Sequence, residues 1–163
     1  MTLKNMTRSA HYLAFDLGAE SGRAVLGWRD GERLQTEIVH RFPNRPVQTT
    51  DGLHWDVLSL WAEMQQGLAL AAAHSENALI SVGVDTWGSD FALLDHQGAL
   101  VSNPWHYRDE RTSGMQELVE QIVPRAELYA QTGNQSMRQN TLLQLLAMVR
   151  QGSSLLDSAH TLL

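Results

Sequence analysis

The stretch AFDLGAESGR, residues 14–23, limits the possible folds of this chain more than any other feature. An apolar run ends in Asp16, a glycine-rich turn follows, and a second apolar run, RAVLGWRD, begins at Arg23. Two extended segments joined by so short a turn predict a β-hairpin. The turn is not a Walker loop, because no GK[ST] sequence follows it. It is not a dinucleotide fingerprint either, because that motif needs a helix after its glycines.

Hydrophobic periodicity predicts an α/β domain whose mixed sheet begins with three antiparallel strands, at residues 12–17, 23–30 and 34–42. The segment NRPVQTTDGLH, residues 44–54, is expected to be a loop because it is polar and contains proline and glycine.

A helix is predicted at residues 57–74, with Asp56 as its N-cap. Its expected apolar face comprises Val57, Leu60, Trp61, Met64, Leu68 and Ala71. The segment ALISVGVDTW, residues 78–87, is almost entirely apolar. Such a strand is typical of one buried on both faces, so we expect it to lie within a sheet covered by helices.

The rest of the chain is predicted to hold one hairpin and several helices. The hairpin covers residues 91–101 and turns at about 96–98. Helical patterns follow at 115–123, 125–133 and 141–152, two of them closing on glycine. The final residues, AHTLL, resemble the start of another element.

Composition excludes several classes of protein. The chain has 163 residues, enough for one domain, and a formal net charge of −6 that does not favour a nucleic-acid-binding surface. The absence of cysteine excludes disulfides and thiolate zinc sites. No signal-peptide core and no apolar run of membrane-spanning length is present, so we expect a cytoplasmic protein that does not enter membranes.

The turn after Asp16 is a candidate phosphate site. Glycine-rich turns allow successive backbone N–H groups to point into one concavity, and such a nest attracts phosphate oxygens. Ser21 can add a hydroxyl and Arg23 a positive charge, while Asp16 can hold the water shell of a Mg²⁺ ion. The alternative is an ordinary glycine hairpin with an exposed aspartate.

The segment DTWGSD, residues 85–90, is a candidate sugar site. Hydroxyl-rich ligands need polar partners beside a flat apolar surface, and Asp85 and Asp90 flank Trp87 here. Gly88 permits close approach of the backbone. In the alternative interpretation Trp87 is a core residue and Asp90 a turn residue.

Other polar residues are given supporting roles. In YRDERT we expect Arg108, Asp109 and Arg111 to stabilise one another and the neighbouring loop through charge-assisted hydrogen bonds, or to form a solvated charge run. Asn140 and Thr141 are expected to cap a helix. The seven histidines show no metal-ligand spacing and are interpreted as surface or hairpin residues.

Four stretches, DLGAESGR, HWDV, GVDTWGSDFALLDHQG and YRDERT, resemble the FGGY carbohydrate kinases of the actin-like ATPase superfamily, and within them the rhamnulokinases. The resemblance covers residues 12–163 and implies a ribonuclease H-like fold. It also implies transfer of the ATP γ-phosphoryl group to the C1 hydroxyl of L-rhamnulose or a related ketose, with Mg²⁺. The implied ATP-binding residues are Asp16, Gly18, Ala19, Glu20, Ser21, Gly22 and Arg23. The implied sugar-binding residues are Gly88, Asp90, Trp87 and Asp85.

The resemblance also predicts what this chain lacks. Residues 1–11 form an extension, and 12–163 match only part of the family's N-terminal domain. The family's base aspartate and its C-terminal lobe lie beyond Leu163, so we expect no kinase activity from the chain alone. Apolar surface left uncovered is expected to favour a homodimer. The alternatives are another FGGY sugar or polyol kinase and a non-catalytic actin-like module.

Overall fold

The computed structural model describes residues 10–76 and 78–163. The residues form two compact units, and each is described separately. The first comprises the described residues up to Arg45 together with Val57–Trp87, and the second comprises Pro46–Asp56 and Gly88–Leu163. Most of the predicted N-terminal extension lies outside the described residues.

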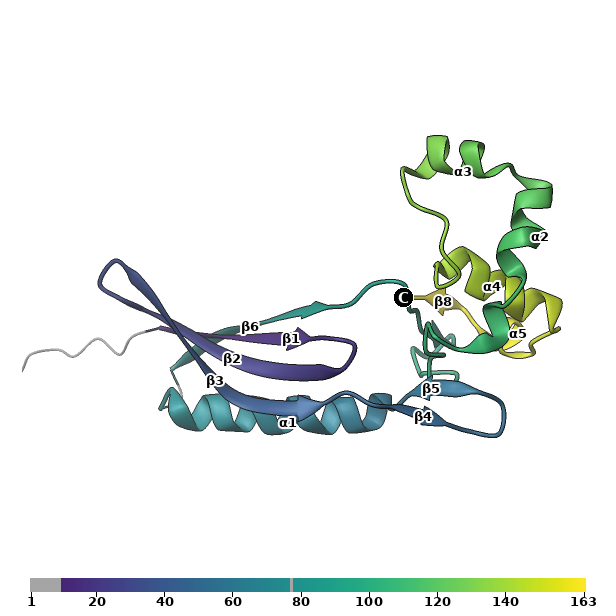
Figure 1. Ribbon diagram of the computed structural model, residues 1–163. Coiled ribbons are helices and arrows are strands. Elements are labelled where there is room, and N and C mark those ends of the chain that lie inside the picture. The colour runs from purple at the N-terminus through teal and green to yellow at the C-terminus, as the bar shows by residue number, and fades with distance from the viewer. Residues whose placement is uncertain (1–9, 77) are drawn as a thin grey trace, which may run out of the picture. The chain divides into compact units, whose positions relative to one another are not determined.

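A four-stranded sheet forms the first unit, in the order β3-β2-β1-β6. Strands β1 (His11–Leu17), β2 (Ser21–Asp30) and β3 (Arg33–Pro43) are antiparallel neighbours, and β6 (Leu79–Thr86) runs parallel to β1. Figure 1 shows this sheet with the N-terminal strands in purple. The predicted meander and the mixed sheet are therefore confirmed.

Helix α1 (Val57–His74) begins and ends where the pattern predicts and covers one face of the sheet (Figure 1). Gly67 permits the close approach, because a Cβ built there would lie 2.8 Å from the Ala24 Cβ. The buried core of this unit comprises Leu13, Phe15, Leu17, Ala24, Leu26, Phe42 and Ala71. The predicted apolar face is only partly correct, since Trp61 and Leu68 remain 57% and 41% exposed.

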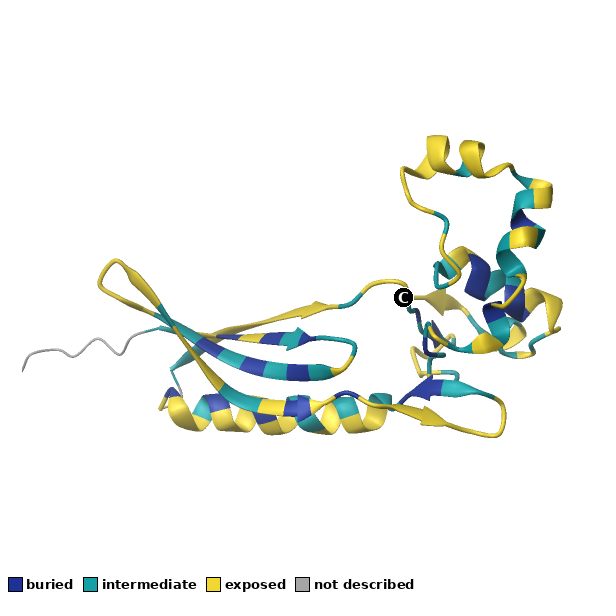
Figure 2. Cartoon of the chain, in the orientation of Figure 1, coloured by how far each residue is buried: buried dark blue, intermediate teal, exposed yellow. Residues whose placement is uncertain are grey.

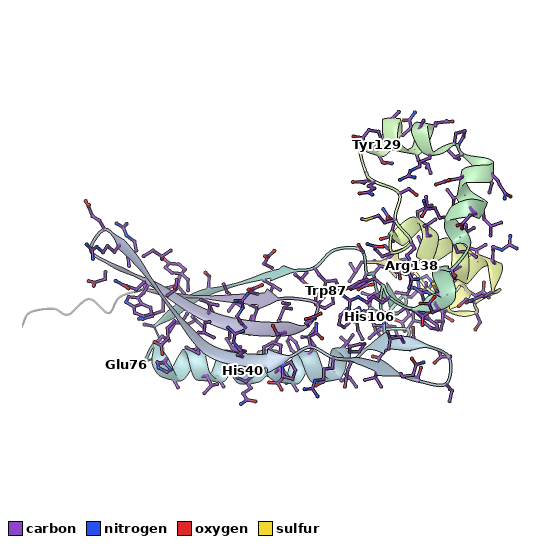
Figure 3. All side chains as sticks on the ribbon, in the orientation of Figure 1. His40, Glu76, Trp87, His106, Tyr129 and Arg138 are labelled. Atoms are coloured by element: carbon purple, nitrogen blue, oxygen red, sulfur yellow. The ribbon has the colours of Figure 1, made fainter. Side chains whose placement is uncertain are left out.

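A hydrogen bond between side chains also joins the helix to the sheet. His40 Nε2 on β3 and Glu63 Oε2 on α1 lie 2.6 Å apart, and the two side chains are 14% and 30% exposed. Figure 3 labels His40. His74 and Glu37 form a second, more exposed pair at 3.4 Å. Both contacts orient α1 toward β3.

The prediction that residues 78–87 form a strand buried on both faces is wrong. Strand β6 is the edge strand of the sheet, and seven of its eight residues are exposed (Figure 2). Val82 and Val84 pair with Leu13 and Phe15, so they belong to the sheet face that α1 covers elsewhere, yet they remain 48% and 56% exposed. An apolar sequence indicates that a strand can be buried on both faces. Whether it is buried depends on the elements that pack against it.

The second unit contains two small sheets. Strands β4 (Pro46–Gln48) and β5 (Leu53–Trp55) form a hairpin where the sequence predicts a loop. Strands β7 (Leu93–Leu94) and β8 (Thr161–Leu162) pair antiparallel. The predicted hairpin turn is confirmed, because the Gly98 N–H donates to the Asp95 carbonyl oxygen.

Helices supply the rest of the second unit. They are η1 (Glu110–Thr112), α2 (Met115–Ile122), α3 (Arg125–Thr132), α4 (Thr141–Arg150) and α5 (Leu155–Ser158). Gly133 ends α3 in a left-handed conformation with φ of 68°, as its position predicts. Phe91, Leu93 and Met148 form the buried cluster beneath α4 and α5. No helix of the described residues is long and apolar enough to cross a membrane.

Candidate functional site

The turn between β1 and β2 leaves two backbone amides unused. The Gly18 N–H donates to the Ser21 carbonyl oxygen at 2.9 Å, which closes the turn and commits that amide. Within the described chain, the amides of Ala19 and Glu20 have no hydrogen-bond acceptor. The Glu20 side chain is exposed, so it does not fill the turn. The amides available to an anion are therefore those of Ala19 and Glu20.

Gly22 is required by packing rather than by backbone conformation. Its φ is not positive, but a Cβ there would lie 2.2 Å from the ring of Phe42. Phe42 is 2% exposed and has little room to move. The aromatic ring of β3 thus packs directly on the backbone at the start of β2.

Asn44 braces the same turn, and sequence reasoning missed it. Its side-chain Nδ2 donates to the Gly18 carbonyl oxygen at 3.0 Å, and its backbone N–H donates to the Glu20 carbonyl oxygen at 3.0 Å. The residue is 6% exposed. The sequence shows only an asparagine just after a predicted strand, and the fold alone brings residue 44 beside residues 18–20.

Three charged side chains form a row across the sheet beside this turn. Asp16 is the cross-strand partner of both Arg23 on β2 and Asp85 on β6. Arg23 Nη2 donates to Asp16 Oδ2, and both side chains are about 40% exposed. Asp16 and Asp85 stand near the carboxyl ends of two parallel strands, where open α/β sheets bind ligands. The row lies on the sheet face opposite α1, because Leu13 and Phe15 alternate with Asp16.

The donor set of this row fits Mg²⁺. Magnesium is usually held by one or two carboxylates, with water and phosphate oxygens completing an octahedron. Asp16 and Asp85 supply two carboxylates on adjacent strands. No group of three or more metal-ligating side chains occurs among residues 10–76 and 78–163, so the row does not form an all-protein cage.

The segment 88–90 of the second unit combines an open residue with two tightly held ones. No described atom lies within 4 Å of a Cβ built on Gly88. Ser89 has φ of 80°, a conformation rare outside glycine. The carboxylate of Asp90 accepts a hydrogen bond from Trp55 Nε1 at 2.7 Å.

The first turn of α4 holds this segment. Thr141 Oγ1 donates to the Ser89 carbonyl oxygen at 2.9 Å, and Gln144 Nε2 donates to the same oxygen at 3.0 Å. Asn140 occupies the N-cap position of α4 as predicted, but the prediction that the side chains of Asn140 and Thr141 cap the helix is wrong. Asn140 Oδ1 accepts from the Met137 N–H, and no side-chain capping bond is made. The Thr141 side chain bonds instead to the distant Ser89 carbonyl oxygen, and the Asn140 side chain bonds to the nearby Met137 N–H.

A polar cavity lies beside Ser89. Its volume is about 340 Å³. Besides Ser89 it is lined by Asn134, Gln135, Met137, Asn140 and Thr141. Amide and hydroxyl groups of this kind suit a ligand that carries several hydroxyls.

The YRDERT segment is bonded to the rest of the second unit. Asp109 accepts from the Leu53 N–H at 2.8 Å and from the Arg111 N–H at 2.9 Å. Arg111 stacks over Trp105 at 4.5 Å. Burial lowers the pKa of Arg111 to about 10, while Asp109 and Asp90 oppose the shift. Arg111 is therefore still charged at neutral pH. Arg108 is exposed and lies 5.2 Å from the ring of Tyr107.

Two histidines predicted at the surface are buried instead. His54 is 6% exposed and packs on Trp105 at 4.1 Å, and His106 is 3% exposed and packs on Trp55 at 4.2 Å. His106 is labelled in Figure 3. Each imidazole packs on an indole ring that lies far away in the sequence, and hydropathy does not reveal such contacts. Burial lowers the pKa of His106.

Trp87 packs against the core of the first unit and is partly buried (Figure 3). This contact favours the interpretation of Trp87 as a core residue, which was one of the two alternatives given by the sequence.

Relatives in sequence are sugar kinases. The chain is 39% identical over 153 residues to a protein named rhamnulokinase from Bacteroides thetaiotaomicron, covering 94% of this chain and 31% of that protein. It is 44% identical over 158 residues to a rhamnulokinase from Klebsiella pneumoniae, covering 94% of this chain and 32% of that protein. The chain thus spans about a third of the length of these curated relatives.

Solved structures show the same fold at low identity. A gluconate kinase from Lactobacillus acidophilus matches with a TM-score of 0.81 and 12% identity, over 95% of this chain and 31% of that chain. A xylulose kinase from the same organism matches with a TM-score of 0.79 and 12% identity, over 94% of this chain and 31% of that chain. The predicted ribonuclease H-like, actin-like ATPase fold is confirmed.

The family model that matches is the N-terminal domain of the FGGY family of carbohydrate kinases, over residues 11–163. The match covers almost the whole chain, and it agrees with the sheet, with the relatives and with the neighbours in structure. This chain belongs to the FGGY family of carbohydrate kinases.

Proposed function

We propose that this chain is the N-terminal part of a kinase that transfers the γ-phosphoryl group of ATP to the C1 hydroxyl of L-rhamnulose. The observation that carries the choice of sugar is the 39% and 44% identity to proteins named rhamnulokinase over nearly the whole chain. We place the reaction in the cytoplasm, where ATP is available.

The turn after β1 supports the nucleotide half of the proposal. The amides of Ala19 and Glu20 are available to phosphate oxygens, and the hydroxyl of Ser21 follows them. Arg23 adds a positive charge beside the turn. Gly18 and Gly22 have no side chain. The backbone can therefore pack closely against Ser21 at Gly18 and against the Phe42 ring at Gly22.

Asp16 and Asp85 would hold Mg²⁺, Asp16 through water. The ion, when bound, neutralises charge on the phosphate oxygens. Arg23 orients the Asp16 carboxylate through their hydrogen bond. Asp85, which the sequence predicts at the sugar site, is exposed beside Asp16 on the adjacent strand, and we assign it here as a second oxygen ligand.

The segment 88–90 supports the sugar half. Gly88 is open to a ligand, and the neighbouring cavity is lined by amides and hydroxyls. Asp90 is bonded to Trp55, so we assign it to the support of the segment as well as to the sugar. Arg108, Asp109 and Arg111 are assigned to the support of the surrounding loops.

The test is an NMR titration of the isotope-labelled 163-residue chain. Mg²⁺ with ATP should shift the amides of residues 18–23, and L-rhamnulose should shift those of Gly88 and Asp90. Substitution of Gly88 by Ala should weaken the sugar response, with Gly83→Ala as the matched control, because both positions have open space.

The outcomes separate the competing functions. Shifts with xylulose, gluconate or glycerol but none with L-rhamnulose would indicate another FGGY kinase. Shifts with nucleotide and none with any sugar would indicate a non-catalytic nucleotide-binding module. We expect no sugar phosphate from the chain alone, because it spans only about a third of the length of its curated relatives. Product formation would contradict that expectation.

A further inference from the structure

The backbone of Ser89 is held in an unfavourable conformation by side chains from another element. Its φ of 80° is uncommon for a residue with a Cβ atom. Such a conformation persists only where surrounding contacts impose it. The Ser89 carbonyl oxygen accepts from Thr141 Oγ1 and Gln144 Nε2, which lie more than 50 residues away in sequence on α4.

Gln144 is the centre of these contacts. It is 1% exposed, and its Nε2 also donates to the Gln139 carbonyl oxygen at 3.0 Å. Its two N–H groups have the Ser89 and Gln139 carbonyl oxygens as acceptors at 3.0 Å, and Asp90 Oδ1 lies 3.5 Å from the same nitrogen. Gln144 is therefore a buried side chain whose donors are directed at the Ser89 backbone and the start of α4.

Arg111 sets the orientation of that amide. Its Nη2 donates to Gln144 Oε1 at 2.5 Å, and a guanidinium can only donate, so the amide oxygen must face it. The amide nitrogen is then directed away from Arg111 toward Ser89. The stacking of Arg111 on Trp105 holds the guanidinium in place.

We propose that Gln144 is a positioning residue for the sugar site, holding Ser89 in its left-handed conformation so that Gly88 and Asp90 are presented to the ligand. The inference rests on the proposed sugar-binding function of this segment. Thr141 assists through its second bond to the same oxygen. Asp90 Oδ1 lies 3.5 Å from Gln144 Nε2, and Asp90 Oδ2 accepts a hydrogen bond from Trp55 Nε1 at 2.7 Å.

The test compares variants of the 163-residue chain. Gln144→Glu keeps the shape and the acceptor for Arg111 but replaces the donor to Ser89 and Gln139 with an oxygen. Thr141→Val removes the second donor with little change of volume. Gln121→Glu, on the exposed surface of α2, is the matched control for charge. The conformation of Ser89 is read from its amide-to-α-proton coupling and its Cα and Cβ chemical shifts, without ligand.

Gln144→Glu should move these Ser89 signals away from left-handed values and weaken L-rhamnulose binding about tenfold, because it removes one donor to the Ser89 carbonyl oxygen and places an oxygen against it. Thr141→Val should act in the same direction by about threefold, because it removes the other donor without introducing an oxygen. Ser89→Gly should restore part of the affinity in the Gln144→Glu background, because glycine adopts positive φ without strain.

The proposal is overturned if Ser89 keeps its left-handed signals in both variants, or if they change and sugar affinity does not. If Gln144→Glu does not fold, Thr141→Val alone decides. If the unaltered chain binds no sugar, the proposed function fails, and the Ser89 signals in the variants still decide whether α4 holds the segment.

Discussion

The buried side-chain amide of Asn44 donates to the carbonyl oxygen of Gly18 at 3.0 Å, across 26 positions of sequence. This bond ties the end of β3 to the turn whose amides we assign to phosphate. The neighbouring bond from the Asn44 backbone to Glu20 cannot be removed by a side-chain change.

Asn44→Ala should therefore destabilise the chain by about 1–2 kcal/mol, because a buried carbonyl loses its donor while the backbone bond remains. Amide hydrogen exchange should accelerate at residues 18–21 and not elsewhere. Asn134→Ala, in an exposed loop, should change neither quantity. Urea unfolding measures the stability, and NMR measures the amide exchange. Equal effects of the two variants would contradict the proposed role of the Asn44 side chain in stabilising the turn.

Gly22→Ala should destabilise the chain by about 1–3 kcal/mol through overpacking, because the new methyl group meets the ring of Phe42. Gly27 lies in the same strand, and a Cβ built there would make only ordinary contacts, at 3.7 Å or more. Gly27→Ala should thus be neutral or slightly stabilising. Denaturant midpoints compare the pair, and a neutral Gly22→Ala would show that Phe42 has room to move.

Asp16→Asn should remove the Mg²⁺ dependence of nucleotide binding while changing the unfolding free energy by less than about 1 kcal/mol, because the ion pair with Arg23 is partly exposed. Asp30→Asn, at the far end of β2, serves as the control. Calorimetric titration with ATP, with and without Mg²⁺, provides the measurement. Retention of full Mg²⁺ dependence in Asp16→Asn would place the ion elsewhere.

Stability should decline in mild acid because of His106. Its Nδ1 accepts from the Arg108 N–H at 3.0 Å, which requires an unprotonated nitrogen. Burial lowers its pKa below the ordinary 6.5, against the pull of Asp90 and Asp109. The unfolded chain thus binds the proton first, so this contribution to stability is complete above pH 6.5 and falls as the pH drops below it.

His106→Asn keeps an acceptor for Arg108 but does not titrate, so its unfolding free energy should depend less on pH below 6.5. His96→Asn, at an exposed turn, should retain the slope of the unaltered chain. Unfolding curves collected across this range measure the difference. Parallel pH profiles for His106→Asn and the unaltered chain would assign the acid sensitivity to other groups.

Self-association through β6 remains a prediction. Its edge is unpaired in the described sheet, and Ile80, Val82 and Val84 are exposed on one face. Val82→Lys should lower the apparent mass in light scattering at high concentration, and Ser81→Lys, on the other face, should lower it less. A compact monomer at every concentration would contradict the prediction.

The turn, the meander and the helix at 57–74 were predictable because their signals are local. Asp16 and the glycines mark a strand end and a turn, and apolar residues recur at helical spacing along the 18 residues of α1, although Trp61 and Leu68 stay exposed. The segments DLGAESGR and DTWGSD likewise indicated two candidate sites through residue type and family resemblance, and these sites stay predictions. These features depend on neighbours within a few positions, which sequence records directly.

Other features depended on partners that are distant in sequence. Asn44 acts on the turn at 18–20, and Gln144 and Thr141 act on Ser89. The exposure of β6 and the burial of His106 depend on which elements pack against them in the folded chain. Sequence alone determined the family, the order of elements and the residue types at the sites. Only the tertiary structure decided which buried donors hold those sites, because a hydrogen bond needs two groups within about 3 Å and sequence spacing does not specify that distance.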